Sequence, residues 1–342
     1  MTISKNVWDY FKTRPLAASL IFAALLPAFV GMESPWLDLA SLALIYGLAI
    51  ISLDLLLGFG GQLSLGHAGF LAVGAYVAAL VFRFTPEVPF GIELLMSGLI
   101  TAFVGLLLGL PTTRLKGHYL ALATLGFGLM IPQLALNFEE ITGGFAGIPV
   151  PPLSIGSSPL ETEGARYYLF FVIVLLCILA MARLLNTGVG RSFMAVRDGE
   201  PAASAMGINV WRTKMLLFML SAFFCGIAGN LFGHYNGLVA PSNFPFLLSA
   251  YLLAAVLVGG RGSLVGGLLG GIFLAVLQQR TAQFGAASEL VAGIVVILIV
   301  VLRPDGLVSL AGSFADWFAQ RRRSNSSRIG RQPPTADREA ST

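Results

Sequence analysis

Long apolar runs, separated by short polar or glycine-rich breaks, dominate the chain. Each run is close to the length of about 17–25 residues with which a helix crosses a bilayer. The pattern predicts an all-α, polytopic integral membrane protein with about ten transmembrane helices, at 16–32, 38–57, 64–82, 91–110, 117–136, 167–185, 214–233, 246–260, 263–279 and 288–303. One alternative stays open: glycines near 259–262 could make 246–279 re-entrant, which would leave eight crossings.

The spans divide five plus five around the long connection 137–166, which predicts a possible inverted repeat. The repeat is a hypothesis, supported by a faint similarity between LLLGFGGQLSLGHAGF and VLVGGRGSLVGGLLGG, which share a glycine-rich break and little else. The organisation expected is a cytoplasmic N-terminal segment at 1–15, a membrane permease domain at 16–310 and a polar cytoplasmic tail at 311–342. We expect this tail to be disordered, because it has too little apolar surface to bury.

Composition agrees with the pattern. The 342 residues are 56% hydrophobic and 11% charged, with a mean hydropathy of +0.82, whereas soluble domains carry roughly 25% charged residues. If both termini and the 186–213 loop are cytoplasmic, all but Arg83, Arg166 and Arg280 of the 21 Lys and Arg lie on that side, as the positive-inside rule requires. The net charge of +4 is spread over loops and tail, so we expect no nucleic-acid partner.

A glycine-rich break between the second and third predicted spans is the first candidate site. Backbone that leaves the helix at membrane depth must be buried in protein or line a wet cavity. Two interpretations stay open: a tight turn between closely packed helices, with contacts at Gly74 and Ala78, or part of the lining of a permeation path. The candidates are Gly58, Gly61, Gln62, Ser64, Gly66 and His67.

Asp54 lies one turn before this break, in an otherwise apolar helix. An ionisable group there is a functional candidate, although it could instead reach water or a neighbouring helix end. A second glycine pattern, Gly262, Gly266 and Gly270, recurs every four residues and predicts a close-packing seam. The sequence leaves open whether this seam faces the same chain or a partner subunit.

The segment 186–213 is too polar to cross a membrane and predicts a short cytoplasmic helix at about 199–206. Asp198 and Glu200 suit its N-terminal end electrostatically. Alanines such as Ala202 and Ala203 give it a small, smooth apolar surface, which favours docking in a groove of another protein. An interfacial helix lying on lipid would want bulkier apolar residues.

Motifs for catalysis are missing from the sequence. No Walker A loop, G-x-S-x-G or H-E-x-x-H occurs, and His67, His118 and His234 have no neighbour at metal-ligand spacing. Cys177 and Cys225 both lie in apolar runs. We expect no catalytic residues, no metal and no cofactor bound by this chain, so that any ATP used would be hydrolysed by partner subunits.

Several motifs resemble the LivM-type permeases, membrane subunits of bacterial ATP-binding-cassette importers for branched-chain amino acids. They run in order from about residue 40 to 310 and are GQLSLGHAGFLAVGAY, TGGFAGIP, VRDGEPAASAMGINVWRTK, LSAFFCGIAGNLFGHYNGLVAPSNF, VLVGGRGSLVGGLLGG and LRPDGL. The resemblance implies a multi-pass inner-membrane permease subunit. It also implies a homologous second permease, two cytoplasmic ATPases, a periplasmic solute-binding protein and contact with membrane lipid.

Permeases of this superfamily dock on their ATPases through a cytoplasmic helix marked E-A-A-x-x-x-G. The resemblance places an ATPase-coupling role on Arg197, Asp198, Glu200, Ala202, Ala203 and Gly207. Two positions depart from the family: Pro201 stands where glutamate is usual, and Asp54 where asparagine is more usual.

The function expected is therefore translocation of branched-chain amino acids by an ATP-driven importer. The alternatives are the related urea-type or aromatic and small-carboxylate importers and, from another class, an ion-coupled secondary carrier. Such a carrier would want several intramembrane carboxylates, and the sequence offers Asp54 as the one evident candidate.

Overall fold

Helices make up most of the computed structural model, which describes residues 31, 34–112, 115, 117–155, 158–159 and 162–302. The N-terminal segment 1–15, nearly all of the first predicted span and the tail 311–342 lie outside the described residues. The long helices are α3 (Pro35–Asp54, continued by the π-helical turn η1, Leu55–Phe59), α4 (His67–Phe84), α5 (Phe90–Thr112), α6 (His118–Asn137), α8 (Glu163–Leu185), α11 (Val210–Asn236), α12 (Phe246–Gly259), α13 (Leu264–Thr281) and α14 (Ser288–Leu302).

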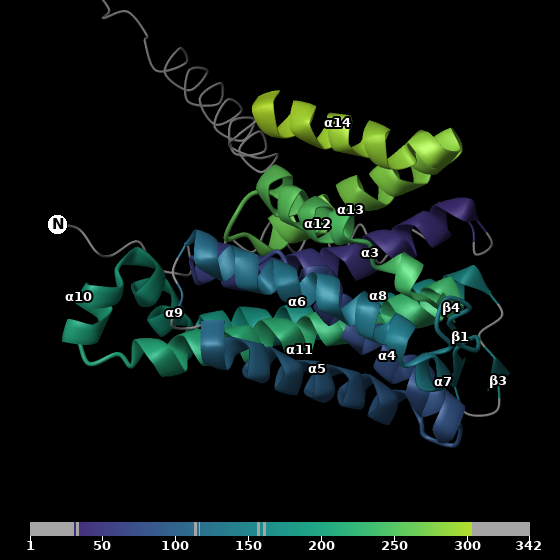
Figure 1. Ribbon diagram of the computed structural model, residues 1–342, viewed down its shortest axis with the longest axis horizontal. Coiled ribbons are helices and arrows are strands. Elements are labelled where there is room, and N and C mark those ends of the chain that lie inside the picture. The colour runs from purple at the N-terminus through teal and green to yellow at the C-terminus, as the bar shows by residue number, and fades with distance from the viewer. Residues whose placement is uncertain are drawn as a thin grey trace, which may run out of the picture.

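Short elements complete the chain at the two ends of the bundle. Helices α9 (Gly188–Asp198) and α10 (Glu200–Ala205) project from one end (Figure 1). The opposite end carries α7 (Glu139–Thr142), η2 (Pro241–Asn243), η3 (Ala282–Ala287) and two small antiparallel sheets. One sheet pairs β1 (Ile148–Pro149) with β4 (Leu238–Val239), and the other pairs β2 (Ser154–Ile155) with β3 (Ser158–Pro159).

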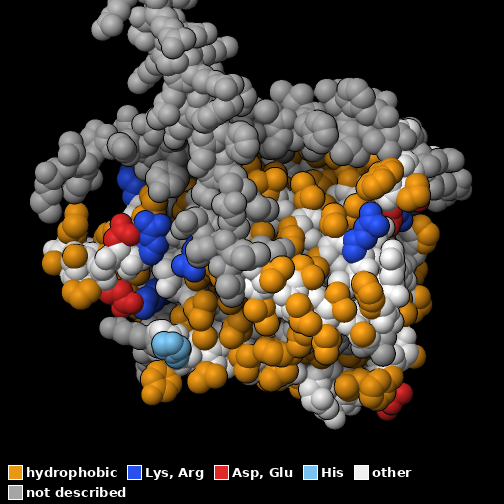
Figure 2. Space-filling view, turned by 90° about the horizontal axis from the view of Figure 1, so that it is seen from above, with side chains coloured by type: hydrophobic (Ala, Val, Ile, Leu, Met, Phe, Trp, Pro, Cys, Tyr) orange, Lys and Arg blue, Asp and Glu red, His pale blue; other side chains and the backbone are white. Residues whose placement is uncertain are grey.

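The centre of the bundle is formed by α3, α4 and α11, whose apolar side chains are mostly buried. Helix α11 packs against α3, α4 and α5, while α13 packs against α3 and α12. Large apolar side chains are exposed on the outer helices, among them Leu99 and Phe103 of α5, Leu176 of α8 and Ile297 of α14. Figure 2 shows apolar side chains over the middle of the α14 face and charged ones towards opposite edges, as a lipid-facing belt would require.

Eight helical segments in the described part of the chain are long and apolar enough to cross a membrane. They correspond to eight of the ten predicted spans, within a few residues at each end. The third span begins three residues later than predicted, because residues 64–66 are not helical and α4 begins at His67. Helix α14 follows the tenth predicted span but has only 15 residues, so a count of ten is not confirmed.

The inverted repeat is not confirmed either. The two glycine-rich breaks that suggested it lie in contact at the same end of the bundle, where the Asp54 carboxylate accepts hydrogen bonds from the backbone of Gly262 and Ser263. Each break follows a helix that runs towards the α9 end, α3 in one case and α12 in the other (Figure 1). The two similar segments therefore have the same direction, whereas inversion would reverse one of them.

Candidate functional site

The chain leaves α-helical geometry at the end of α3. The turn Leu55–Phe59 is π-helical, and backbone hydrogen bonds from Gly61 N to Leu57 O (3.2 Å) and from Gln62 N to Leu56 O (2.8 Å) close it. An irregular stretch then leads to α4 at His67. A π-helical turn inserts an extra residue into a helix and frequently marks a functional position, so the break predicted from the glycines is present.

Asp54 joins this turn to the break between α12 and α13. Its Oδ1 accepts from Gly262 N at 2.9 Å and its Oδ2 from Ser263 N at 3.1 Å, and the residue is 2% exposed. The sequence left open whether the Asp54 side chain reaches water or the end of a neighbouring helix. It reaches the helix end, because Ser263 is the N-cap of α13. Gly58 allows this close approach, since a Cβ there would clash with the Asp54 carboxylate and with Gly262 N.

Arg197, at the end of α9, contacts the same turn from the projecting side. Its Nη1 donates to the Gly58 carbonyl at 2.8 Å, and its Nε donates to Asp198 Oδ1 at 2.9 Å. Gly61 has a φ of +65°, and a Cβ there would lie 2.8 Å from Arg197 Cγ. We call Asp54, Gly58, Arg197, Gly262 and Ser263 the Asp54 junction, because it joins α3, α9 and the α12–α13 break.

The short helix predicted at 199–206 is present as α10, Glu200–Ala205. Ala202 and Met206 are exposed, as a docking surface requires, but Ala203 is 2% exposed and faces the protein. The expectation that Ala203 belongs to the exposed surface is therefore wrong. Glu200 forms an ion pair with Lys214 of the same chain, with 2.6 Å between Oε1 and Nζ, which secures α10 to the start of α11. Gly207, with a φ of +83°, ends the segment.

Ser64, Gly66 and His67 lie in packed protein. His67 is fully buried, with Nδ1 3.1 Å from Ser64 Oγ and Nε2 3.0 Å from Ser221 Oγ. Ser221 donates its own proton to the Ser52 carbonyl, so Ser221 accepts from His67 Nε2–H and Nδ1 accepts from Ser64. This arrangement holds α4 against α3 and α11.

Gln62, Gly66 and Gly74 all lie in closely packed parts of the bundle. Gln62 is 5% exposed, and neither polar atom of its side chain has a partner among the described residues. A Cβ at Gly66 would clash with the Thr124 carbonyl of α6. Gly74 does make a close helix contact, as its spacing predicts, but the contact is with Gly226 of α11 rather than with the helix that precedes the break.

The glycine seam of α13 faces helices of the same chain. Gly266 lies against the carbonyls of Gly259 and Gly260, and Gly270 against the Ala255 carbonyl of α12. The glycines beside them, Gly267 and Gly271, meet α3. Small residues let the three backbones approach closely, and this answers the question that the sequence left open.

A second buried polar cluster was missed in the sequence. Glu93 Oε1 accepts from Asn230 Nδ2 at 2.8 Å and lies 2.7 Å from His234 Nε2, while Asn230 Nδ2 also reaches Ser97 Oγ at 2.9 Å. His234 Nδ1 lies 3.2 Å from the Pro151 carbonyl. These four side chains, the Glu93 cluster, join α5 to α11. The signal available was the four-residue spacing of Glu93 and Ser97, and of Asn230 and His234, along apolar helices.

Comparison with known proteins decides the family. The model of a family described as the permease component of branched-chain amino acid transport systems matches residues 36–301. The chain belongs to this permease family. It is 36% identical over 319 residues to the high-affinity branched-chain amino acid transport system permease protein LivM of Salmonella typhimurium, covering 86% of this chain and 74% of that protein. The match to Escherichia coli LivM has the same identity and coverage.

More distant relatives include the corresponding LivH permease of Salmonella typhimurium, 21% identical over 77% of this chain and 91% of that protein. No solved structure is a significant match. The permease is a multi-pass membrane protein with a transport role. Among its described residues, no three His, Cys, Asp or Glu side chains lie close enough together to hold a metal ion.

Proposed function

We propose that this permease is one membrane subunit of an ATP-driven importer of branched-chain amino acids in a bacterial inner membrane. The LivM relatives carry this substrate class in their names, and the family model covers most of the chain. The permease pairs with a homologous second permease, as the similarity to LivH supports. Two cytoplasmic ATPases hydrolyse the ATP, and a periplasmic solute-binding protein delivers the amino acid; this chain binds no cofactor of its own.

The contact between Arg197 and Gly58 carries the proposal. Helix α10, with Ala202 and Met206 exposed, docks on the ATPase, and both chain termini lie on this cytoplasmic side. Arg197 lies near the end of α9, three residues before Glu200 at the start of α10, and its side chain holds the π-helical turn that follows α3. A displacement of α10 therefore reaches a membrane helix through one charged hydrogen bond, which is stronger than a neutral one.

Asp54 extends this route to a second pair of helices. Because its carboxylate holds the backbone of Gly262 and Ser263, a shift of the π-helical turn also moves the α12–α13 break. Hinges in proteins are commonly a few residues at the ends of elements, and both breaks have that form. The cycle of ATP binding and hydrolysis in the partners opens and closes the solute path by moving α3, α12 and α13 through the Asp54 junction.

Reconstitution tests the proposal. The permease, the second permease, the two ATPases and the binding protein are assembled in proteoliposomes, and uptake of radiolabelled leucine, urea and benzoate is measured with and without ATP. The proposal expects ATP-dependent leucine uptake that needs the binding protein. Uptake of urea or benzoate in place of leucine would overturn the solute, and uptake driven by an imposed ion gradient without ATP would overturn the class of transporter.

A further inference from the structure

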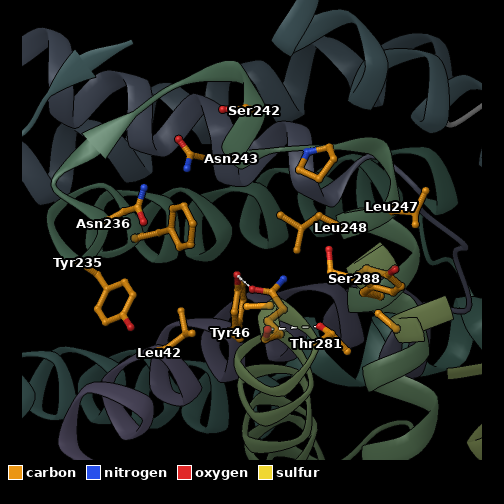
Figure 3. A pocket seen from close by; sticks show the side chains of 16 residues that line it. Leu42, Tyr46, Tyr235, Asn236, Ser242, Asn243, Leu247, Leu248, Thr281 and Ser288 are labelled. Atoms are coloured by element: carbon orange, nitrogen blue, oxygen red, sulfur yellow. Dashed lines mark hydrogen bonds between the residues drawn. The ribbon is translucent and has the colours of Figure 1, made fainter. Parts of the chain in front are cut away.

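A pocket of about 350 Å³ opens at the end of the bundle opposite α9 and α10. Its volume lies at the lower end of the range of roughly 300–1,000 Å³ that is typical of small-molecule sites. Helices α3, α11, α12, α13 and α14 all contribute side chains to it. Figure 3 shows Tyr46, Tyr235, Leu248 and Ser288 around the same space. No part of the Asp54 junction lines it.

The lining is polar and aromatic without carrying charge. Tyrosine, phenylalanine and leucine side chains supply apolar surface, and asparagine, glutamine, serine and threonine supply hydrogen-bonding groups. Among the described residues that line the pocket, none is Asp, Glu, Lys, Arg or His. Burying an ionised group without a counter-charge costs several kcal/mol. A pocket of this kind suits a solute without net charge, which includes a zwitterion whose own charges balance.

Three amides in the lining have hydrogen-bonding capacity left over. Tyr46 donates to Gln278 Oε1 at 2.6 Å, Asn243 Oδ1 accepts from Ala240 N at 2.7 Å, and Asn236 Nδ2 donates to Leu238 O at 2.8 Å. Among the described residues this leaves two amide donors, on Asn243 and Gln278, and one amide acceptor, Asn236 Oδ1, without a partner. The pocket can therefore satisfy both an anionic and a cationic group of one solute.

The partial charges at the ends of α11 and α12 agree with this arrangement of free side-chain groups. Helix α11 ends at Asn236, and α12 begins at Phe246 without a side-chain cap. The partial charge is negative at a helix C-terminus and positive at an N-terminus. The free acceptor of Asn236 lies at the negative end and the free donor of Asn243 close to the positive end, so the side chains and the backbone agree on where each charge of a zwitterion would go.

We propose that this pocket binds the transported amino acid as a neutral zwitterion. This inference rests on the proposed function and adds the place and the chemistry of solute binding. The carboxylate accepts from Asn243 near the start of α12, and the ammonium group donates to Asn236 at the end of α11. The aliphatic side chain packs against Phe232 and Leu248. Lysine and glutamate are excluded because the described lining residues offer no counter-charge for their side chains.

Cysteine protection tests the site directly. The complete importer is prepared with Cys177→Ser and Cys225→Ser, and single cysteines are placed at two pocket positions from different elements, Ser242→Cys in η2 and Ser288→Cys in α14. Ala287→Cys is the matched control, since Ala287 is exposed and does not line the pocket. Maleimide labelling is timed with leucine, lysine or glutamate present, and leucine uptake by each variant is measured in parallel.

Leucine should slow labelling of both pocket cysteines by about threefold at about twice its Kd, because labelling follows the unoccupied fraction of sites. Lysine and glutamate should leave the rates unchanged, and the control should be insensitive to all three. Equal labelling with and without leucine, in variants that still transport leucine, would overturn the pocket assignment alone. A parent complex that does not transport leucine would overturn the proposed function, and the pocket assignment with it.

Discussion

The Asp54 junction and the Glu93 cluster are both buried and polar, yet they connect the molecule in different ways. At the junction, side chains hold backbone atoms of irregular segments: Asp54 binds the amides of Gly262 and Ser263, and Arg197 binds the Gly58 carbonyl. In the Glu93 cluster, side chains of two regular helices bind one another. Regular helices joined along their length resist relative motion, whereas irregular segments can change their backbone angles. Under the proposed function, the Asp54 junction is the part that moves and the Glu93 cluster is a fixed brace.

The amount of folded importer should be most sensitive to Gly58. A Cβ there would clash with both the Asp54 carboxylate and Gly262 N, so Gly58→Ala should lower the yield of assembled complex and its thermal stability. Overpacking of this kind typically costs about 1–3 kcal/mol. Gly126→Ala is the matched control, because nothing lies within 4 Å of a Cβ at this position. Equal loss of yield in the two variants would remove the steric basis of the junction.

Enlarging two neighbouring alanines of α10 should have different effects, because only one of them lies on the docking surface. Ala202→Trp enlarges an exposed position on α10 and should abolish co-purification of the ATPases and leucine uptake while the permease still folds. Ala203→Trp enlarges a position that is 2% exposed and should instead reduce the amount of folded permease. Ala202→Ser, which keeps the surface small, should behave like the parent. An Ala202→Trp importer with its ATPases bound and normal uptake would refute docking through α10.

The Glu93 cluster should affect stability without affecting coupling. Glu93→Leu removes the partner of His234 Nε2 and leaves Asn230 Nδ2 with Ser97 Oγ alone. An unsatisfied buried polar group costs about 1–3 kcal/mol, so the melting temperature should fall. Glu93→Gln keeps one acceptor oxygen, so the melting temperature of this variant should fall less. The ratio of leucine taken up to ATP hydrolysed should be unchanged in both. A change in that ratio would show that the cluster is part of the moving machinery.

The smallest effect is expected for Asp54→Asn. The amide side chain keeps one acceptor for Gly262 or Ser263 and loses the other, so uptake should fall only about two- to fivefold, the change that corresponds to about 0.4–1 kcal/mol. Asp54→Leu removes both acceptors and should cost far more. Equal uptake by the asparagine and leucine variants would mean that the hydrogen bonds to the α12–α13 break carry no function.

The sequence predicts these two regions unequally. Glycine spacing and one aspartate within an apolar run point to the break after α3, because both features depend on neighbours close in the chain. The partner of that break, Arg197, lies 139 residues away from Gly58, and no local periodicity links them. His234 appears isolated for the same reason, since Glu93 is 141 residues away. The burial of Ala203 depends on how α10 packs against the bundle, and this packing cannot be predicted from composition.

The helices themselves were predictable because a membrane demands long apolar runs, and eight of the predicted spans coincide with helices of sufficient length. The pocket opposite α9 could not be predicted in this way. Its described lining residues lie between positions 42 and 292, and all of them are uncharged residues that are ordinary in a membrane helix. Only their convergence in the fold forms the pocket.

The central claim is that Arg197 couples the ATPases to the membrane helices, and Arg197→Ala tests it most directly. Arg191→Ala is the control, because Arg191 lies on the same helix and, among the described residues, its side chain donates a hydrogen bond to the nearby Asn186 carbonyl rather than to a membrane helix. Both importers are reconstituted, and leucine uptake and ATP hydrolysis are measured on the same preparation. We expect Arg197→Ala to keep its ATPases and hydrolyse ATP while uptake falls about tenfold, the factor that corresponds to one charged hydrogen bond. A normal ratio of uptake to hydrolysis in Arg197→Ala, equal to that of Arg191→Ala, would contradict coupling through the Asp54 junction.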